Sequence, residues 1–183
     1  MEHRLSGFKP FTQETPMSCG ACAARMVLEY LGFSYPESAI RQKVRTSKRA
    51  GTLPWLLTRG MNRAFEESGS GYRLKMERKA TLDRISLSLQ NGLPVIVSLL
   101  VENQFRKGTL IGHYLVVTRI DHEKREIELA NPFGAAEIMG FNEFEKAWEF
   151  DYRGSALHLP RIMKFAMALG ITKPRTLFVP GPA

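Results

Sequence analysis

The chain has 183 residues, of which 44% are hydrophobic and 24% charged, as expected for a globular protein with a core of its own. Its net charge of +8 is uneven, because residues 1–84 carry 15 basic and 8 acidic side chains, which indicates a surface that attracts anions. The longest apolar run, residues 93–101, is too short to cross a bilayer, and two cysteines cannot form a disulfide framework. We therefore expect a cytoplasmic protein without a membrane span.

The first part of the chain is predicted to be helical. Apolar residues recur at helical spacing after Ser18, which is a suitable N-cap residue. Pro36 is tolerated in the first turn of a second helix, and Thr52 is the expected N-cap of a third. We expect helices over 18–31, 36–44 and 53–68, followed by a short strand over 71–78.

The rest of the chain is richer in β-branched residues and predicts mainly strands. The expected elements are a helix over 81–92, strands over 94–101, 113–121 and 125–131, helices over 141–150 and 160–170, and an edge strand or extended tail over 176–179. Helices followed by mostly antiparallel strands indicate an α+β fold, with an N-terminal helical layer packed on the sheet. No linker divides the sequence, so residues 1–183 are predicted to form a single domain.

Cys19 and Cys22 have C-x-x-C spacing, which leaves three readings open. A zinc site normally needs further Cys or His ligands at comparable spacing, and the four histidines are isolated in the sequence, so no metal is expected. A redox pair would usually follow the buried strand of a βαβ unit, which the preceding FTQETPMS does not resemble. In the third reading Cys19 is a nucleophile, because a helix N-terminus favours the thiolate and predicts a lowered thiol pKa.

Three other residues favour the nucleophilic reading of Cys19. His113 begins one predicted strand and Asn131 ends the next, so in an antiparallel pair the two side chains would meet at one edge of the sheet. An amide oxygen there can accept from the imidazole and fix its tautomer, as in a Cys-His-Asn triad. Gln13, six residues before the cysteine, could donate its amide to an oxyanion beside the thiol.

These elements resemble a known family in their order and spacing. Q-x-x-x-x-x-C-G at 13–20, G-H-Y-x-V-V at 112–117 and N-P at 131–132 are similar to the papain-like cysteine peptidases of the bacteriocin-processing type, which cut leader peptides after a double glycine, and to their stand-alone relatives. The resemblance covers about residues 10–150, and the extension over 155–183 has no counterpart in it. Ser18 also differs from the Asp that family members often have before the nucleophile.

The resemblance implies a papain-like fold and a role for each residue. Cys19 would be the nucleophile, and His113 would act first as general base and then as general acid. Asn131 stands where the family has Asp or Asn to orient the imidazole. Gln13 would polarise the substrate carbonyl, together with the backbone N–H of the cysteine. Cys22, on the next helical turn, would be a packed thiol.

The expected function is a thiol-dependent peptidase that hydrolyses a peptide or isopeptide bond through an acyl-enzyme, with no cofactor. Acyl transfer to an amine or thiol is an alternative outcome of the same chemistry. A non-catalytic peptide-binding protein is another alternative, in which the basic stretches 41–49 and 73–84 hold an acidic partner. A C-x-x-C redox protein is less favoured. No nucleic-acid-binding motif accompanies the basic residues.

Overall fold

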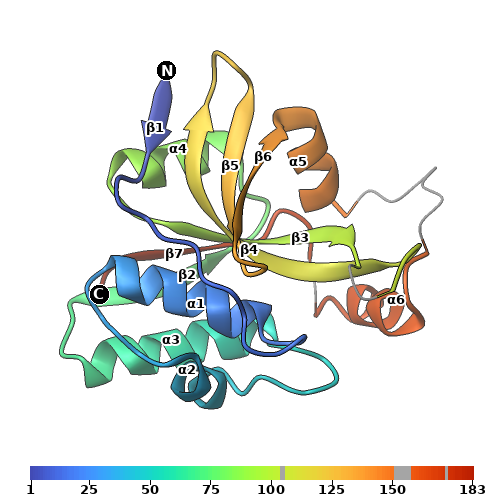
Figure 1. The fold of residues 1–183 in the computed structure, drawn as a ribbon, viewed down its shortest axis with the longest axis horizontal. Helices are drawn as coiled ribbons and strands as arrows, with labels where there is room; N and C mark the ends of the chain where they lie inside the picture. The colour runs from blue at the N-terminus through green and yellow to red at the C-terminus, as the bar shows by residue number, and fades with distance from the viewer. Residues whose placement is uncertain (104–105, 151–157, 172) are drawn as a thin grey trace.

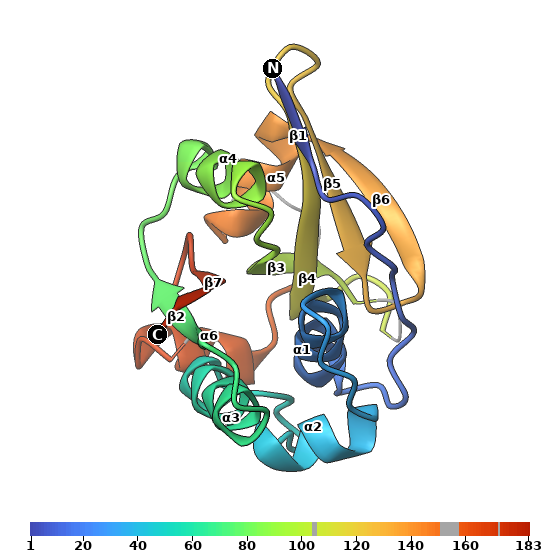
Figure 2. The same ribbon diagram turned by 90° about the vertical axis from the view of Figure 1, so that its left-hand side faces the viewer.

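The computed structural model describes residues 1–103, 106–150, 158–171 and 173–183. A seven-stranded sheet, with strand order β2-β7-β3-β4-β5-β6 and β1 added beside β4, forms the middle layer. Helices α1, α2 and α3 gather on one side of the strands, and α4 and α5 on the other (Figures 1 and 2). The predicted α+β fold is therefore confirmed, and a second helical layer is added to it.

Helices α1 (Cys19–Tyr30), α2 (Glu37–Lys43) and α3 (Pro54–Glu67) form the N-terminal layer. Their apolar faces share one buried cluster with side chains from the sheet, which include Ile96, Val116 and Phe178. Thr52 was predicted to be the N-cap of α3, and this is wrong: Leu53 occupies the N-cap position, and Pro54 is the first helical residue. The carbonyl of Thr52 instead accepts a hydrogen bond of 3.1 Å from the hydroxyl of Tyr114 on β4.

The sheet consists of β1 (Glu2–Arg4), β2 (Tyr72–Glu77), β3 (Val95–Glu102), β4 (Leu110–Asp121), β5 (Glu126–Asn131), β6 (Ala135–Gly140) and β7 (Leu177–Pro182). All pairs of these strands are antiparallel. Successive residues of β3 alternate between the two faces: Ile96 packs with α1–α3, whereas Val95 and Val97 pack in the opposite cluster. Burial on both faces explains why β3 is apolar except for Ser98 and its last residue, Glu102.

The second helical layer is formed by α4 (Leu82–Gln90) and α5 (Phe141–Trp148). Ile85 of α4 and Phe144 of α5 are fully buried in the cluster on this face of the sheet. Helix α6 (Arg161–Ala168) lies beside the end of the β3–β4 hairpin (Figure 1), where Met163 joins a small cluster with Leu100 and Leu110.

Three strands differ from the prediction. β7 is an interior strand rather than an edge strand or tail, because it lies between β2 and β3 and pairs with both. β1 and β6 were not predicted: β1 has only three residues, and β6 has small residues at Ala135 and Ala136 and mostly exposed or half-buried side chains. Residues 155–157, the start of the predicted extension, lie outside the described residues.

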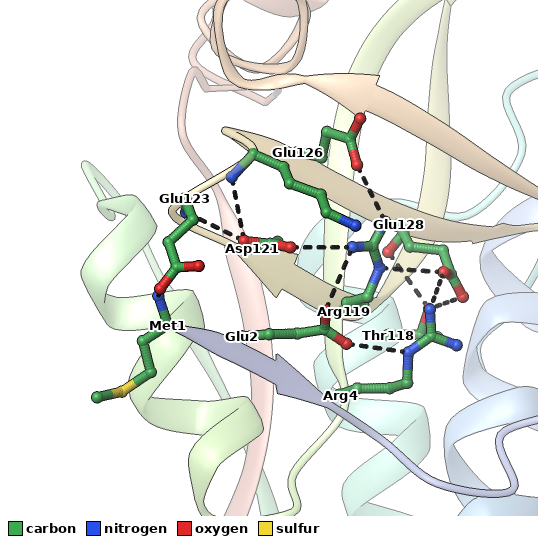
Figure 3. Close-up of polar contacts among 10 residues, drawn as sticks. Met1, Glu2, Arg4, Thr118, Arg119, Asp121, Glu123, Glu126 and Glu128 are labelled. Carbon is green, nitrogen blue, oxygen red and sulfur yellow. Dashed lines mark hydrogen bonds and ion pairs between the residues drawn. The ribbon is translucent and has the colours of Figure 1, made fainter.

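β1 is attached to the sheet by charged side chains as well as by backbone pairing with β4. Arg119 of β4 is buried, and its guanidinium forms ion pairs of 3.3 to 3.7 Å with four carboxylates, those of Glu2, Asp121, Glu126 and Glu128 (Figure 3). Arg4 of β1 also binds Glu128, at 2.8 Å. A buried guanidinium requires such compensation, since an unpaired buried charge is costly.

Candidate active site

Cys19 is the first residue of α1, where backbone N–H groups have no intrahelical acceptor. Ser18 occupies the predicted N-cap position, but its hydroxyl makes no capping hydrogen bond to the helix. The hydroxyl instead donates to the carbonyl of Thr15 at 2.9 Å and accepts from the N–H of Thr15. The side chain thus closes the turn before the helix and leaves the N–H groups of the first helical turn without a side-chain cap. Such a terminus can bind a developing negative charge.

The thiol of Cys19 faces the backbone N–H groups of Tyr114, Gly20 and Cys19 itself. Burial of the sulfur raises its pKa, the nearby Glu37 carboxylate acts in the same direction, and the three N–H groups lower it; burial dominates. The lowered thiol pKa predicted from the helix terminus alone is therefore wrong for the unliganded protein. Cys19 is half-buried by its residue surface, and this burial arises where α1 packs against β4, a contact that no local pattern in the sequence indicates.

His113 and Asn131 lie where the strand register brings them together. The paired segment of β4 and β5 ends with Val116 opposite Ala130. His113 lies three residues before this end on β4, and Asn131 lies one residue after it on β5. The Nε2 atom of His113 lies 2.9 Å from Oδ1 of Asn131. The expectation that these residues meet at one edge of the strand pair agrees with this contact.

The amide of Asn131 is oriented by two further contacts, which also fix the tautomer of His113. Its Oδ1 accepts from the N–H of Phe133 at 3.0 Å, and its Nδ2 donates to Oε1 of Glu137 at 2.7 Å. Because Oδ1 can only accept, His113 must donate through Nε2–H. Nδ1 is left unprotonated in the neutral imidazole and is the nitrogen that can take up a proton.

The imidazole of His113 is buried, with 3% of its residue surface exposed. The ring of Phe133 stacks on it, with 4.4 Å between the ring centroids. Burial lowers the pKa of His113, while the hydrogen bond to Asn131 and the negative charge of Glu137 oppose this shift. Burial thus favours the neutral forms of both the imidazole and the thiol of Cys19.

Gln13 lies beside the end of β5, because its N–H donates to the carbonyl of Pro132 at 2.6 Å. Its Nε2 donates to the carbonyl of Thr15 at 2.7 Å, which uses one of the two amide hydrogens. Oε1 is buried and accepts no hydrogen bond from the described residues. The adjoining N–H of Glu14 is held by both carboxylate oxygens of Glu37, at 3.0 and 3.2 Å. The segment that carries Gln13 is therefore fixed by both β5 and α2.

A cleft of about 420 Å³ contains the side chains of both Cys19 and His113. One wall comes from the helical half of the chain and the other from β3, β4 and Phe133. Helix α6 adds Met163, Phe165 and Ala166. Asn131 lies behind the imidazole, with 4% of its surface exposed. The arrangement gives a thiol, an oriented imidazole and free helical N–H groups in one largely apolar cavity.

Cys22 does not share this environment. It is fully buried, and its thiol donates to the carbonyl of Phe11 with an S–O distance of 3.4 Å. Burial and the carboxylate of Glu37 raise its pKa. Both cysteines are free thiols. Among the described residues, no group of three or more His, Cys, Asp and Glu side chains could hold a metal ion.

Sequence reasoning missed Glu37, Phe133 and Glu137. Glu37 is a fully buried carboxylate at the start of α2, and its burial is compensated by hydrogen bonds from the backbone N–H of Glu14, in the segment before Cys19. Glu137 lies on β6, which was not predicted. Phe133 could have been noticed as an aromatic residue directly after Asn131-Pro132.

The sequence over residues 5–155 matches the model of the Peptidase_C39 like family. The chain belongs to this family. The match confirms the family resemblance described above, and it ends before α6 and β7, which lie outside the matched residues. No curated protein matches the chain significantly.

Solved structures of Peptidase_C39 domains share the fold. A putative C39-like peptidase from Bacillus anthracis has a TM-score of 0.66 at 12% identity, covering 100% of this chain and 98% of the other. A double glycine motif protease from an AMS/PCAT transporter, solved with its leader peptide, has a TM-score of 0.61 at 14% identity and 99% coverage of both chains. The peptidase domain of Streptococcus ComA has a TM-score of 0.57 at 19% identity, covering 77% of this chain and 92% of that domain.

Together these similarities confirm the papain-like fold of a cysteine peptidase family. Within the described ranges, no helix is sufficiently long and apolar to cross a lipid bilayer.

Proposed function

We propose that the protein is a cysteine peptidase that hydrolyses a peptide or isopeptide bond, with Cys19, His113, Asn131 and Gln13 as its catalytic residues. The observation that carries this proposal is the hydrogen bond of 2.9 Å between His113 and Asn131, in a cavity shared with Cys19. A histidine held in one tautomer beside a thiol is the arrangement that a thiol nucleophile requires.

In the first step, Nδ1 of His113 accepts the thiol proton as the sulfur of Cys19 attacks the substrate carbonyl. The neutral forms favoured by burial mean that this proton moves during the attack rather than before it. The oxyanion is stabilised by the backbone N–H of Cys19 and by the second amide hydrogen of Gln13. The imidazolium then protonates the leaving amine, and a thioester remains on the cysteine.

In the second step, His113 takes a proton from a water molecule that attacks the thioester, and it returns the proton to the sulfur as the acid product leaves. An amine or thiol in place of water would give acyl transfer by the same route. The leader peptide bound to the AMS/PCAT relative supports a peptide as substrate. A thiol nucleophile must remain reduced, so we propose a reducing compartment such as the cytoplasm.

The proposal is tested by exchanging each cysteine separately. Cys19→Ala should abolish peptide hydrolysis and labelling by a peptide-based electrophile such as a peptidyl vinyl sulfone, which is attacked by the sulfur with the help of His113 in the same way as a substrate. Cys22→Ala removes a buried thiol that lies outside the cleft, and should retain at least about half of both signals. Mass spectrometry of the labelled protein and a quenched fluorescent peptide library provide the two readouts.

An inactive Cys22 variant beside an active Cys19 variant would contradict the assignment and favour the redox reading. Binding of peptides without any turnover in the wild type would favour a non-catalytic protein.

A further inference from the structure

A second hollow adjoins the catalytic cleft and differs from it in charge. Its lining includes Pro16, Met17, Arg41, Arg45, Ser47 and Lys48. Pro16 and Met17 also line the catalytic cleft, so the two cavities are neighbours on either side of the segment that leads into α1. The hollow therefore lies close to the expected path of a bound substrate.

An ordered turn separates the two cavities. Ser47 and Gly51 exchange backbone hydrogen bonds of 2.8 and 3.0 Å, and the hydroxyl of Ser47 accepts from the N–H groups of Arg49 and Ala50. Ser47 and Lys48 line the hollow, whereas Arg49 to Gly51 line the catalytic cleft. The turn thus presents basic side chains to both sides.

The hollow contains three cationic side chains and no carboxylate. Arg41 pairs with Glu14 at 3.0 Å. The side chains of Arg45 and Lys48 are exposed and form no ion pair or hydrogen bond within the part of the chain that the structure describes, and the same holds for Arg49 in the cleft. Cations that no internal carboxylate compensates produce a local positive potential.

We propose that this hollow is an anion-recognition subsite that selects peptide substrates with Asp or Glu near the scissile bond. The inference rests on the proposed peptidase function and names a substrate class for it. Arg45 and Lys48 would contact the substrate carboxylates directly, while Arg41 is already paired. Arg49, on the cleft side of the turn, would extend the same preference toward the thiol.

The position and the lining of the hollow favour an acidic peptide over a nucleic acid. The subsite shares two lining residues with the catalytic cleft, so a chain bound across Cys19 reaches it without leaving the protein surface. No aromatic side chain lines the hollow, whereas binding of single-stranded nucleic acid generally uses aromatic stacking together with cations.

The first experiment compares cleavage of a peptide library by the wild type and by Arg45→Gln/Lys48→Gln, with cleavage sites read by mass spectrometry. The wild type should show enrichment of Asp and Glu at a fixed offset from the cut. The double variant should lose that enrichment and cut the acidic peptides about tenfold more slowly, because exposed charge pairs contribute modestly. Its rate on uncharged peptides should stay the same.

Lys9→Gln/Arg63→Gln is the matched control, since it removes one exposed Lys and one exposed Arg that lie outside both cavities and outside the basic stretches 41–49 and 73–84. It should cut acidic peptides like the wild type. If both double variants lose the preference for acidic peptides, the preference results from the net charge of the protein, and the proposed subsite is wrong.

A binding experiment separates this proposal from the peptidase proposal. The Cys19→Ala protein is titrated, by fluorescence anisotropy, with a labelled ten-residue peptide of alternating Glu and Gly and with its Gln counterpart. The Glu peptide should bind more tightly, with an affinity that falls with salt and with Arg45→Gln/Lys48→Gln. If the Glu peptide binds in this way but the wild type cleaves no peptide, the peptidase proposal is rejected and the anion-recognition subsite is retained.

Equal binding of the Glu and Gln peptides would overturn the subsite, whatever the protein cleaves. A single-stranded oligonucleotide of equal charge that binds more tightly than the Glu peptide, and depends on the same two residues, would assign the hollow to nucleic acid instead.

Discussion

At the level of single residues, the protonation of His113 decides the pH range in which the proposed peptidase works. The imidazole must be neutral to accept the proton of the thiol. Burial lowers its pKa from the ordinary 6.5, so the protonated, inactive form appears only at lower pH. We expect the acidic limb of kcat/KM to have its midpoint below 6.5.

Two variants assign this limb to His113. Its hydrogen bond to Asn131 and the charge of Glu137 both raise its pKa, so removing either should move the midpoint further toward low pH. Asn131→Ala also releases the tautomer and should reduce kcat/KM by about 10²-fold. Glu137→Gln can still accept from Asn131, and should shift the midpoint with little loss at neutral pH. An acidic limb that both variants leave in place would belong to another group.

The candidate site residues could be proposed from the sequence, but their environment could not. Cys19, His113 and Asn131 were proposed because helix starts and strand ends are local features, and the structure pairs His113 with Asn131 and places Cys19 and His113 in one cleft. Gln13, proposed from its spacing before Cys19, is not among the residues that line this cleft. The raised pKa of Cys19 results from packing between α1 and β4, whose residues are far apart in the chain. Likewise, the carboxylate of Glu37 meets the backbone of Glu14 only after α2 has packed against the N-terminal segment.

Among the elements, the contact between α2 and α3 depends on Gly60. A Cβ atom added at this position would lie 2.6 Å from the backbone carbonyl of Lys43, which cannot move aside as a flexible side chain could. In an exposed helix Gly→Ala stabilises by about 1 kcal/mol. At Gly60 the steric clash should outweigh this gain in helix propensity, and we expect Gly60→Ala to lower the free energy of unfolding by about 1–3 kcal/mol.

Urea denaturation followed by circular dichroism measures this change. Gly71→Ala serves as the control, because a Cβ at Gly71 meets nothing within 4 Å. A Gly60 variant as stable as the wild type would show that α2 and α3 can separate without cost.

Local patterns predicted the elements well where periodicity and end signals agree. Helix α4 follows Thr81, whose hydroxyl accepts from the N–H of Arg84, and Asn91 is its C-cap, so the helix lies within the predicted range 81–92. Strand β6 escaped prediction because Ala135, Ala136 and Gly140 do not favour strands. Its pairing partner β5 supplies the register that the local sequence lacks.

On the scale of the whole molecule, we propose that residues 155–183 belong to the same domain as the core at about 10–150. β7 fills the space between β2 and β3, and the indole N–H of Trp148 donates to the carbonyl of Thr176 at 3.0 Å. Strand order was not readable from the sequence, because long-range pairing leaves no local signal. The residues at 176–179 predicted an edge strand or extended tail, and the interior position of β7 contradicts that placement.

Phe178 provides the test of this proposal. Its side chain is fully buried in the cluster under α1–α3, so Phe178→Ala should lower the free energy of unfolding by about 3–5 kcal/mol. Phe165, on α6, is 63% exposed, and its replacement by Ala should change stability by less than about 0.5 kcal/mol. Chemical denaturation compares the two. A negligible loss with Phe178→Ala would mean that β7 is an appendage.

The interior position of β7 also affects how the protein is made. Domains begin to fold while the ribosome is still translating them, and pairing between distant segments is slow. β2 and β3 are synthesised early but have no hydrogen bonds to each other, since the strand that joins them ends at residue 182. In a nascent chain, the edges of β2 and β3 that face β7 therefore stay unpaired until residue 182 has left the exit tunnel. During this interval the exposed strand edges are most prone to aggregation and most in need of chaperones.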